Sequence, residues 1–454
     1  MPFVKNIDRR TAISALGGGL GMLGLSDHIA LAGEQASARH HPPRARRVIQ
    51  LFMNGGPFQG DFFDPKPALN KYEGQRPGEV ELRTERKTGG LLGSPYKFSR
   101  HGESGLEISE LLPRLSQHAD DICVLRSVYT DNPNHGPALL LMNNGTISPT
   151  VPSMGSWLMY GLGSVNQNLP GYVVLCPGRP VRFSILWSSA FLPSQFQGSY
   201  VNHSTITPES MLPFLKNDKL NLTEQRDELD LVASLNRLHA GARGGDGQLN
   251  ARMSAMETAF RMQSAGHEAF DLSVEPSTIR EEYGEGHFAN GCLLARRLVE
   301  RDVRFVQVYY GNGQPWDTHN KHNETVKGLA KSIDQPIAAL LSDLKRRGML
   351  DDTLVIWGGE FGRTPVSENG SGRDHNHYGM TMWLAGGGSR GGYAHGATDE
   401  FGFRAVQDRM HVHDVHATIL HLLGIDHERL TYNYAGRDYR LTDVAGKVAQ
   451  AVLA

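Results

Sequence analysis

The sequence predicts an α/β protein with a central, mostly parallel sheet flanked by helices. Two apolar runs, TLVIW at 353–357 and MTMWLA at 380–385, have the composition of buried strands in a sheet covered on both faces. A strand at 303–310 is followed by a helix over roughly 324–347 and then by TLVIW, and such a crossover joins parallel strands. The 52 glycines fit a loop-rich enzyme better than a helical bundle.

Composition narrows the function classes. The 46 basic and 48 acidic residues leave a formal charge of −2, so neither nucleic acid nor an anionic membrane is indicated as a partner. The cysteines lack CxxC spacing and argue against a disulfide scaffold and a thiolate metal site; they are Cys123, Cys176 and Cys292. Many of the 20 histidines lie beside Asp or Glu, which directs attention to histidine–carboxylate chemistry.

The N-terminus has the pattern of a twin-arginine export signal. Arg9 and Arg10 precede a weakly apolar, glycine-rich segment at 12–25, and small residues at 30–32 offer a cleavage site. A short membrane anchor or a flexible tail is the alternative, but the segment is too short to span a bilayer. We expect a periplasmic or extracellular protein with no integral membrane span in the mature chain. The predicted signal peptide, linker and single α/β domain lie at 1–32, 33–47 and 48–454.

The sequence of the first half of the domain predicts strands that are followed by polar residues. A strand at 48–53 leads to a glycine turn and to Asp61, which we expect to be a metal ligand. A helix at 109–118 and a strand at 122–128 follow, and the next polar loop puts His135 at the start of an apolar helix. Backbone N–H groups there favour an anion such as phosphate or sulfate, and a capping or packing role for His135 is an equal alternative.

Several other segments carry no candidate metal ligands, and most of them are predicted to pack around the core. A strand at 171–176 precedes an aromatic loop at 177–200, which either lines a substrate cleft or covers the core. Residues from about 222 to 286 predict mainly amphipathic helices, which we interpret as an insertion without chemistry of its own. Near the C-terminus, 412–425 predicts an amphipathic helix whose histidines are helix-face residues, and 442–454 predicts a short closing helix.

Two polar loops after predicted strands carry candidate metal ligands. The strand at 303–310 ends in a glycine turn that leads to Asp317 and His319, although a solvated loop that caps the next helix is the alternative there. TLVIW leads into a second, glycine-rich loop, whose candidate side chains are Glu360, Arg363, Asp374, His375 and His377. Because open α/β sheets bind ligands at strand ends, the histidines and carboxylates of these loops predict a divalent metal site.

Longer motifs resemble a known family. GGPFQGDFFDPKP, WDTH, WGGEFGRTP and DHNHYGMTMWLAGGG together are similar to the bacterial, sulfatase-like DUF1501 family, which is common in exported proteins of planctomycete-type bacteria. The resemblance covers nearly all of the mature chain. It implies the fold of the alkaline phosphatase and sulfatase superfamily, a central, mostly parallel sheet flanked by helices, with one or two metals at the strand ends.

The resemblance also implies roles for single residues. His377 corresponds to the final metal ligand of the superfamily, Glu360 to the acidic group after the preceding strand, and Asp317 with His319 to its mid-chain pair. His135 stands where sulfatases have the Cys or Ser that becomes formylglycine, so conventional formylglycine chemistry is not indicated.

These features predict a metal-dependent hydrolase or transferase that acts on sulfate or phosphate esters of a small molecule or a glycan. Arg363 would clamp the anion, and His135 would be the nucleophile or the general acid and base. Zinc or manganese is favoured, with magnesium or calcium as alternatives. The predicted metal ligands are Asp61, Asp317, His319, Glu360, Asp374, His375 and His377. The alternative function is a non-catalytic exported scaffold or carbohydrate-binding protein, with its binding surface around Trp187 and Phe191.

Overall fold

The computed structural model describes residues 39–454 except 79–82, 214, 216, 218 and 244–246. The predicted export signal and the start of the predicted linker lie outside the described residues. Among the helices of the described part, none has the length and hydropathy of a membrane span.

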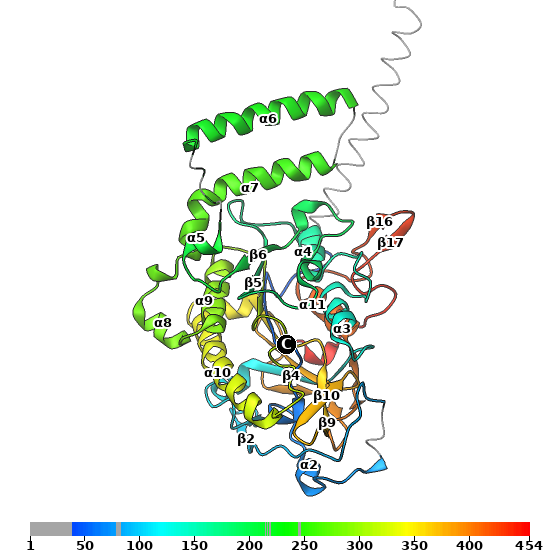
Figure 1. Cartoon of the computed structure of the whole chain (residues 1–454). Coiled ribbons are helices and arrows are strands. Elements are labelled where there is room, and N and C mark those ends of the chain that lie inside the picture. The colour runs from blue at the N-terminus through cyan, green and yellow to red at the C-terminus, as the bar shows by residue number, and fades with distance from the viewer. Residues whose placement is uncertain (1–38, 79–82, 214, 216, 218, 244–246) are drawn as a thin grey trace, which may run out of the picture.

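A nine-stranded sheet crosses the described part of the chain (Figure 1). Its strands are β1 (Arg47–Phe52), β4 (Ile122–Tyr129), β5 (Tyr172–Cys176), β6 (Ser199–Asn202), β7 (Phe305–Tyr309), β8 (Thr353–Gly358), β11 (Met380–Ala385), β12 (Tyr393–His395) and β15 (Met410–His411). The strand order is β12-β4-β11-β8-β1-β7-β5-β6, with β15 also paired to β4. Pairing is parallel from β8 through β1, β7 and β5 to β6, and β11 is antiparallel to its two neighbours. The predicted mostly parallel sheet is confirmed.

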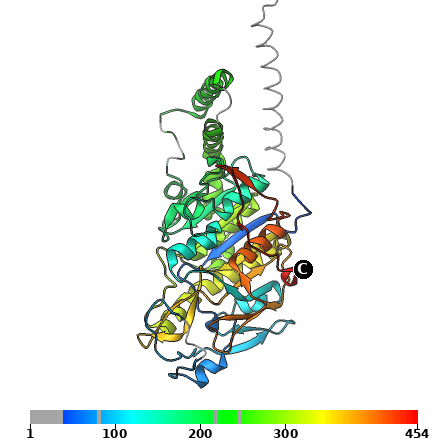
Figure 2. The same cartoon turned by 90° about the vertical axis from the view of Figure 1, so that its right-hand side faces the viewer.

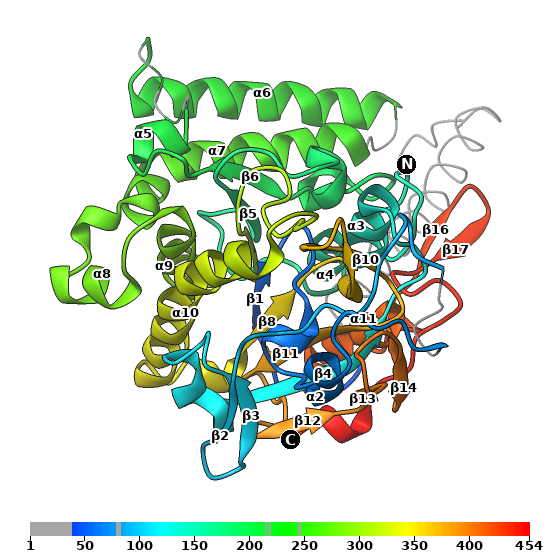
Figure 3. The same ribbon diagram turned by 60° about the horizontal axis from the view of Figure 1, so that its bottom comes forward.

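Helices cover both faces of this sheet, as Figure 3 shows. One face is packed by α9 (His287–Glu300) and α10 (His322–Arg346), and the other by α3 (His135–Asn144), α4 (Met154–Leu162) and α11 (Val412–Leu422). The alternation of side chains along β1 supplies both cores: Ile49 and Leu51 point into the first, and Val48 and Phe52 into the second. From Val48 to Phe52 the strand is buried on both faces, as predicted for a doubly covered sheet, with Gln50 as its one polar residue in that stretch.

A helical arm extends from the body of the molecule (Figures 1 and 2). Its two long helices lie side by side, and shorter helices join it to the body, which confirms the helical prediction for this region. The helices are α5 (Pro208–Met211), α6 (Leu222–Arg243), α7 (Gly247–Phe270) and α8 (Ser277–Tyr283). Further short elements are α2 (Pro67–Lys71), β13 (Ala397–Thr398), β14 (Ala405–Gln407), β16 (Tyr432–Tyr434) and β17 (Arg437–Tyr439).

The polar segment between β8 and β11, predicted to be a loop, is a hairpin. Strand β9 (Gly362–Glu368) pairs antiparallel with β10 (Gly372–Asn376). Residues 369–371 connect them, and Asn369 and Gly370 have φ angles of 52° and 78°. Two positive φ angles are the requirement of a type I′ turn, and Asn-Gly is its preferred sequence. The hairpin gives the polar side chains a rigid support.

Two predicted helices are wrong. The segment expected as a helix at 109–118 starts at the end of β3 (Leu106–Ser109), which pairs with β2 (Phe98–His101), and continues through turns into a 3₁₀ segment at Leu115–Asp121. The turn between these strands uses positive φ at Gly102 and Gly105, which favours a hairpin. The expected closing helix at 442–454 is reduced to a 3₁₀ turn at Gln450–Val452.

Candidate metal centre

Three neighbouring parallel strands bring the candidate residues together. The chain leaves β1, β8 and β7 at the same edge of the sheet, so the segments that hold Gly55, Glu360 and Asp317 meet there. Gly55 has a φ of +117°, and a Cβ atom on it would lie 2.5 Å from Asp317 N. Glycine is thus required for the close approach of these two loops.

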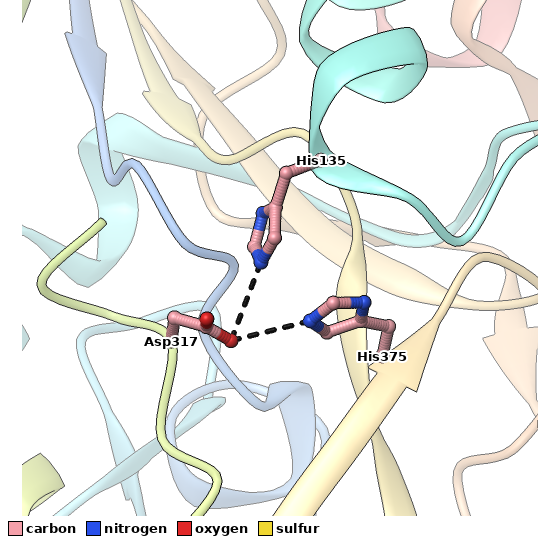
Figure 4. Close-up of side chains that lie close together, drawn as sticks. All are labelled: His135, Asp317 and His375. Atoms are coloured by element: carbon pink, nitrogen blue, oxygen red, sulfur yellow. Dashed lines mark hydrogen bonds and ion pairs between the residues drawn. The ribbon is translucent and has the colours of Figure 1, made fainter. Parts of the chain in front are cut away.

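Three imidazoles surround one oxygen atom of Asp317. The distances from Asp317 Oδ1 are 2.9 Å to His319 Nε2, 3.2 Å to His375 Nε2 and 3.3 Å to His135 Nε2. Figure 4 shows His135 at the start of α3 and His375 on its strand, both directed at Asp317. The Asp317 side chain is 21% exposed, so water reaches the cluster.

The second nitrogen of each imidazole is bonded to a carboxylate. Nδ1 of His135 lies 2.7 Å from Glu360 Oε1. Nδ1 of His319 is bonded to Glu368, and Nδ1 of His375 to Glu85. A carboxylate behind the imidazole is the usual arrangement around metal-bound histidine, because it orients the ring and leaves the other nitrogen free for the metal.

Asp374 adds a second group of ligand atoms. The side chains of His319, Asp374 and His375 offer ligand atoms within 4.8 Å of one another, as do those of His135, Asp317 and His375. Asp374 is fully buried, and its Oδ1 has no hydrogen-bond partner among the described residues. A shift in strand register between Arg373 and His375 accompanies the placement of adjacent residues at one site, as β-bulges do elsewhere.

Hydrogen bonds within the cluster shift the pKa values of three of its members in favour of their charged forms. Burial raises the pKa of Asp317, but hydrogen bonds with His135, His319 and His375 hold that pKa well below its usual range. Burial lowers the pKa of His135, yet its bonds with Asp317 and Glu360 raise it overall. The bond with Asp317 likewise raises the pKa of His319. Protons and a metal ion would therefore compete for the same nitrogen atoms.

Arg363 is a structural support of Asp317. The side chain is completely buried, and its Nη2 donates to Asp317 Oδ1 at 2.6 Å. Its other donors bond the backbone carbonyls of Gly55, Gly56 and Arg373. Because its N–H groups are directed at these partners, Arg363 is placed to hold the loop that carries Asp317 against the end of β1 rather than to contact a substrate.

Other predicted ligands lie beside the cluster or away from it. Glu360 contacts His135 and belongs to neither ligand group. Asp61 is bonded to His322 Nε2 at 2.7 Å and to Ser94. His377 is half-buried against the ring of Tyr378 and lies outside both groups.

Sequence reasoning missed the supporting carboxylates Glu85 and Glu368. Glu85 lies 290 positions before His375, and no motif connects the two residues. Glu368 could have been found from the Asn-Gly turn signal, because that turn pairs its strand with the strand of His375.

Comparison with models of protein families shows to which family this chain belongs. The model of the family described as "Protein of unknown function (DUF1501)" matches residues 45–453. The chain belongs to the DUF1501 family. The resemblance seen in the motifs is thereby confirmed, and the cluster around Asp317 is a feature of a DUF1501 protein. No curated protein matches the chain.

Solved structures similar to this DUF1501 protein are distant. Lipoteichoic acid synthase LtaP from Listeria monocytogenes has a TM-score of 0.36 at 10% identity, over 84% of this chain and 72% of that chain. PsFucS1 sulfatase from Pseudoalteromonas sp. has a TM-score of 0.36 at 13% identity, over 90% and 72%. The C-terminal periplasmic domain of EcEptC from Escherichia coli, in a complex with Zn, has a TM-score of 0.34 at 9% identity, over 84% and 83%. The function is therefore argued from the side chains of the site.

Proposed function

We propose that this protein is a zinc-dependent hydrolase of phosphate or sulfate esters. The observation that carries the proposal is the set of three imidazoles whose Nε2 atoms surround Asp317 Oδ1 while their Nδ1 atoms are bonded to carboxylates. His135, Asp317 and His375 hold the ion, and His319 with Asp374 forms the adjoining group.

The donor set fits zinc. Ligand atoms of a four-coordinate zinc lie roughly 3.3 Å apart, as follows from Zn–N distances of about 2.0–2.1 Å. The observed separations of 2.9–3.3 Å from Asp317 Oδ1, and of 3.1 Å between His319 Nε2 and His375 Nε2, match that spacing. A majority of imidazoles favours zinc over magnesium or calcium, which prefer oxygen, and manganese is the second candidate. Asp374 Oδ1, which has no hydrogen-bond partner among the described residues, would be satisfied by a cation nearby.

Each residue of the cluster has a role in this proposal. A bound zinc ion would supply a Lewis acid and a water molecule of lowered pKa. His135 acts as a ligand rather than as a nucleophile, because Glu360 orients its ring toward Asp317. The hydroxyl of Thr318 is turned away and lies 2.6 Å from His322 Nδ1. Water is therefore the proposed nucleophile.

Metal analysis of two histidine variants tests the metal centre. The wild type, purified without chelators, should contain at least one zinc per chain. His375→Ala should lose the metal, because His375 belongs to both ligand groups, and His377→Ala should retain it. Stoichiometric metal in His375→Ala, or none in the wild type, contradicts the proposal.

Turnover of 4-nitrophenyl phosphate and 4-nitrophenyl sulfate tests the reaction. Hydrolysis of at least one ester should stop on removal of the metal and return with added zinc. Inactivity on both esters with full zinc content would favour the alternative of a scaffold or carbohydrate-binding protein. Against that alternative, Trp187 is 2% exposed and stacks on Tyr200, so its ring is not available to a glycan, and Phe191 is half-buried against tyrosines.

We also propose export by the twin-arginine route, on the pattern of the N-terminal residues alone. Replacement of Arg9 and Arg10 by lysine should retain the protein in the cytoplasmic fraction, whereas the wild type should be processed and recovered outside it. Equal distribution of both forms would contradict this proposal.

A further inference from the structure

The loop after β5 borders the metal centre. Strand β5 is parallel to β7, so the segment 177–183 leaves the sheet at the same edge as the loop that carries Asp317. The two loops are joined directly: Gly313 N donates to Arg179 O at 2.9 Å, and Arg179 N donates to Asn312 Oδ1 at 2.8 Å. The position of the segment 177–183 therefore depends on that of the loop that carries Asp317.

Arg182 in this loop is held over the beginning of α3. A Cβ atom on Gly136 would lie 2.6 Å from Arg182 Nη2 and 2.7 Å from its Nε, so the guanidinium packs where glycine leaves space. Gly136 directly follows the metal-centre residue His135. The guanidinium therefore packs on the first turn of α3 next to His135, and the loop that carries it is bonded through Arg179 to the loop of Asp317.

Arg182 has no charged partner among the described residues. Arg182 is exposed, and none of the described residues forms a hydrogen bond or ion pair with its guanidinium. Two other arginines near the cluster are engaged, since Arg363 bonds Asp317 and Arg86 bonds Glu368 at 3.0 Å. Arg182 also has a φ of 69°, a left-handed conformation that is costly for arginine.

We propose that Arg182 receives the anionic oxygens of the substrate ester beside the metal centre, a role that the sequence alone predicts for Arg363. The inference rests on the proposed ester hydrolase function and adds the substrate-binding group to it. A guanidinium with free N–H donors matches the oxygens of a phosphate or sulfate group, and it remains charged at every physiological pH. The substrate class is an ester whose oxyanion reaches both the metal and Arg182.

Binding of inorganic phosphate and inorganic sulfate to the full-length, zinc-loaded protein tests this role. We expect Arg182→Gln to weaken binding of the preferred anion by at least about tenfold, as for the loss of a charged hydrogen bond, with zinc content unchanged. Arg182→Lys should restore part of the affinity. Arg280→Gln is the matched control, because Arg280 is also exposed but lies on α8 in the helical arm.

A second variant displaces the guanidinium without removing it. In Gly136→Ala the new Cβ would lie 2.6 Å from Arg182 Nη2, so the guanidinium must shift, and a smaller loss of anion affinity is expected although the arginine is present. Wild-type anion affinity in Arg182→Gln overturns the inference, as does a wild type that binds neither anion, or a variant that loses its zinc together with the anion. Absence of zinc from the wild type would instead overturn the proposed metal centre, so the two failures are distinguishable.

Discussion

The carboxylates behind the imidazoles should set the metal affinity, and Glu360 should have the largest effect. Glu360 is completely buried, and its two oxygens accept from Gly55 N–H at 3.0 and 3.2 Å. Oε1 also lies 2.7 Å from His135 Nδ1. In Glu360→Gln an NH₂ group must face one of these donors. Because a hydrogen bond to a charged group contributes about 1.5–3 kcal/mol, zinc affinity should fall roughly 10- to 100-fold.

Glu85 provides a graded comparison. Its bond to His375 Nδ1 has the same form, but its side chain is 32% exposed, so water compensates for much of the loss. Glu85→Gln should therefore lower zinc affinity only a few-fold. Competition against a chromophoric zinc chelator measures both variants, with the exposed Glu428→Gln as control and urea unfolding to report stability. A wild-type affinity in Glu360→Gln, or a larger loss in Glu85→Gln, would refute the reasoning.

Three further predictions concern buried groups. Asp61→Ala leaves the Nε2–H of buried His322 without an acceptor. It should lower the free energy of unfolding, measured by urea titration, by about 1–3 kcal/mol and leave the metal content unchanged. Loss of metal would show that Asp61 is a ligand. Gly55→Ala should reduce zinc content, because its Cβ would displace the backbone of Asp317, and a wild-type zinc content would contradict this. Burial lowers the pKa of His416 to about 3, and the unfolded imidazole titrates near 6.5, so stability should be lost as pH falls from 6.5 toward 3, by roughly 1.4 kcal/mol per pH unit. His416→Gln should flatten that slope in urea titrations across pH, and an unchanged slope would count against the assignment.

The sequence by itself determined the sheet and the neighbourhood of the site. The runs that became β8 and β11 are mostly apolar and are buried along their whole length, as strands of a doubly covered sheet are. The helix between β7 and β8 required parallel strands. Since parallel strands end at one edge, polar residues directly after them, such as Asp317, had to gather there. The helix that begins at His135 was also correctly predicted.

Only the tertiary structure decided which polar residues face one another. Asp374 and His375 contribute to the cluster from a strand with a local register shift, and His377 lies beyond the end of that strand. Whether the Arg363 guanidinium is available to a substrate or bonded within the protein depends on burial by segments distant in the chain. The bond between Glu85 and His375 likewise joins residues 290 positions apart. Periodicity and motifs report local conformation and strand order, whereas the direction of a side chain and its long-range partner follow from packing of the complete chain.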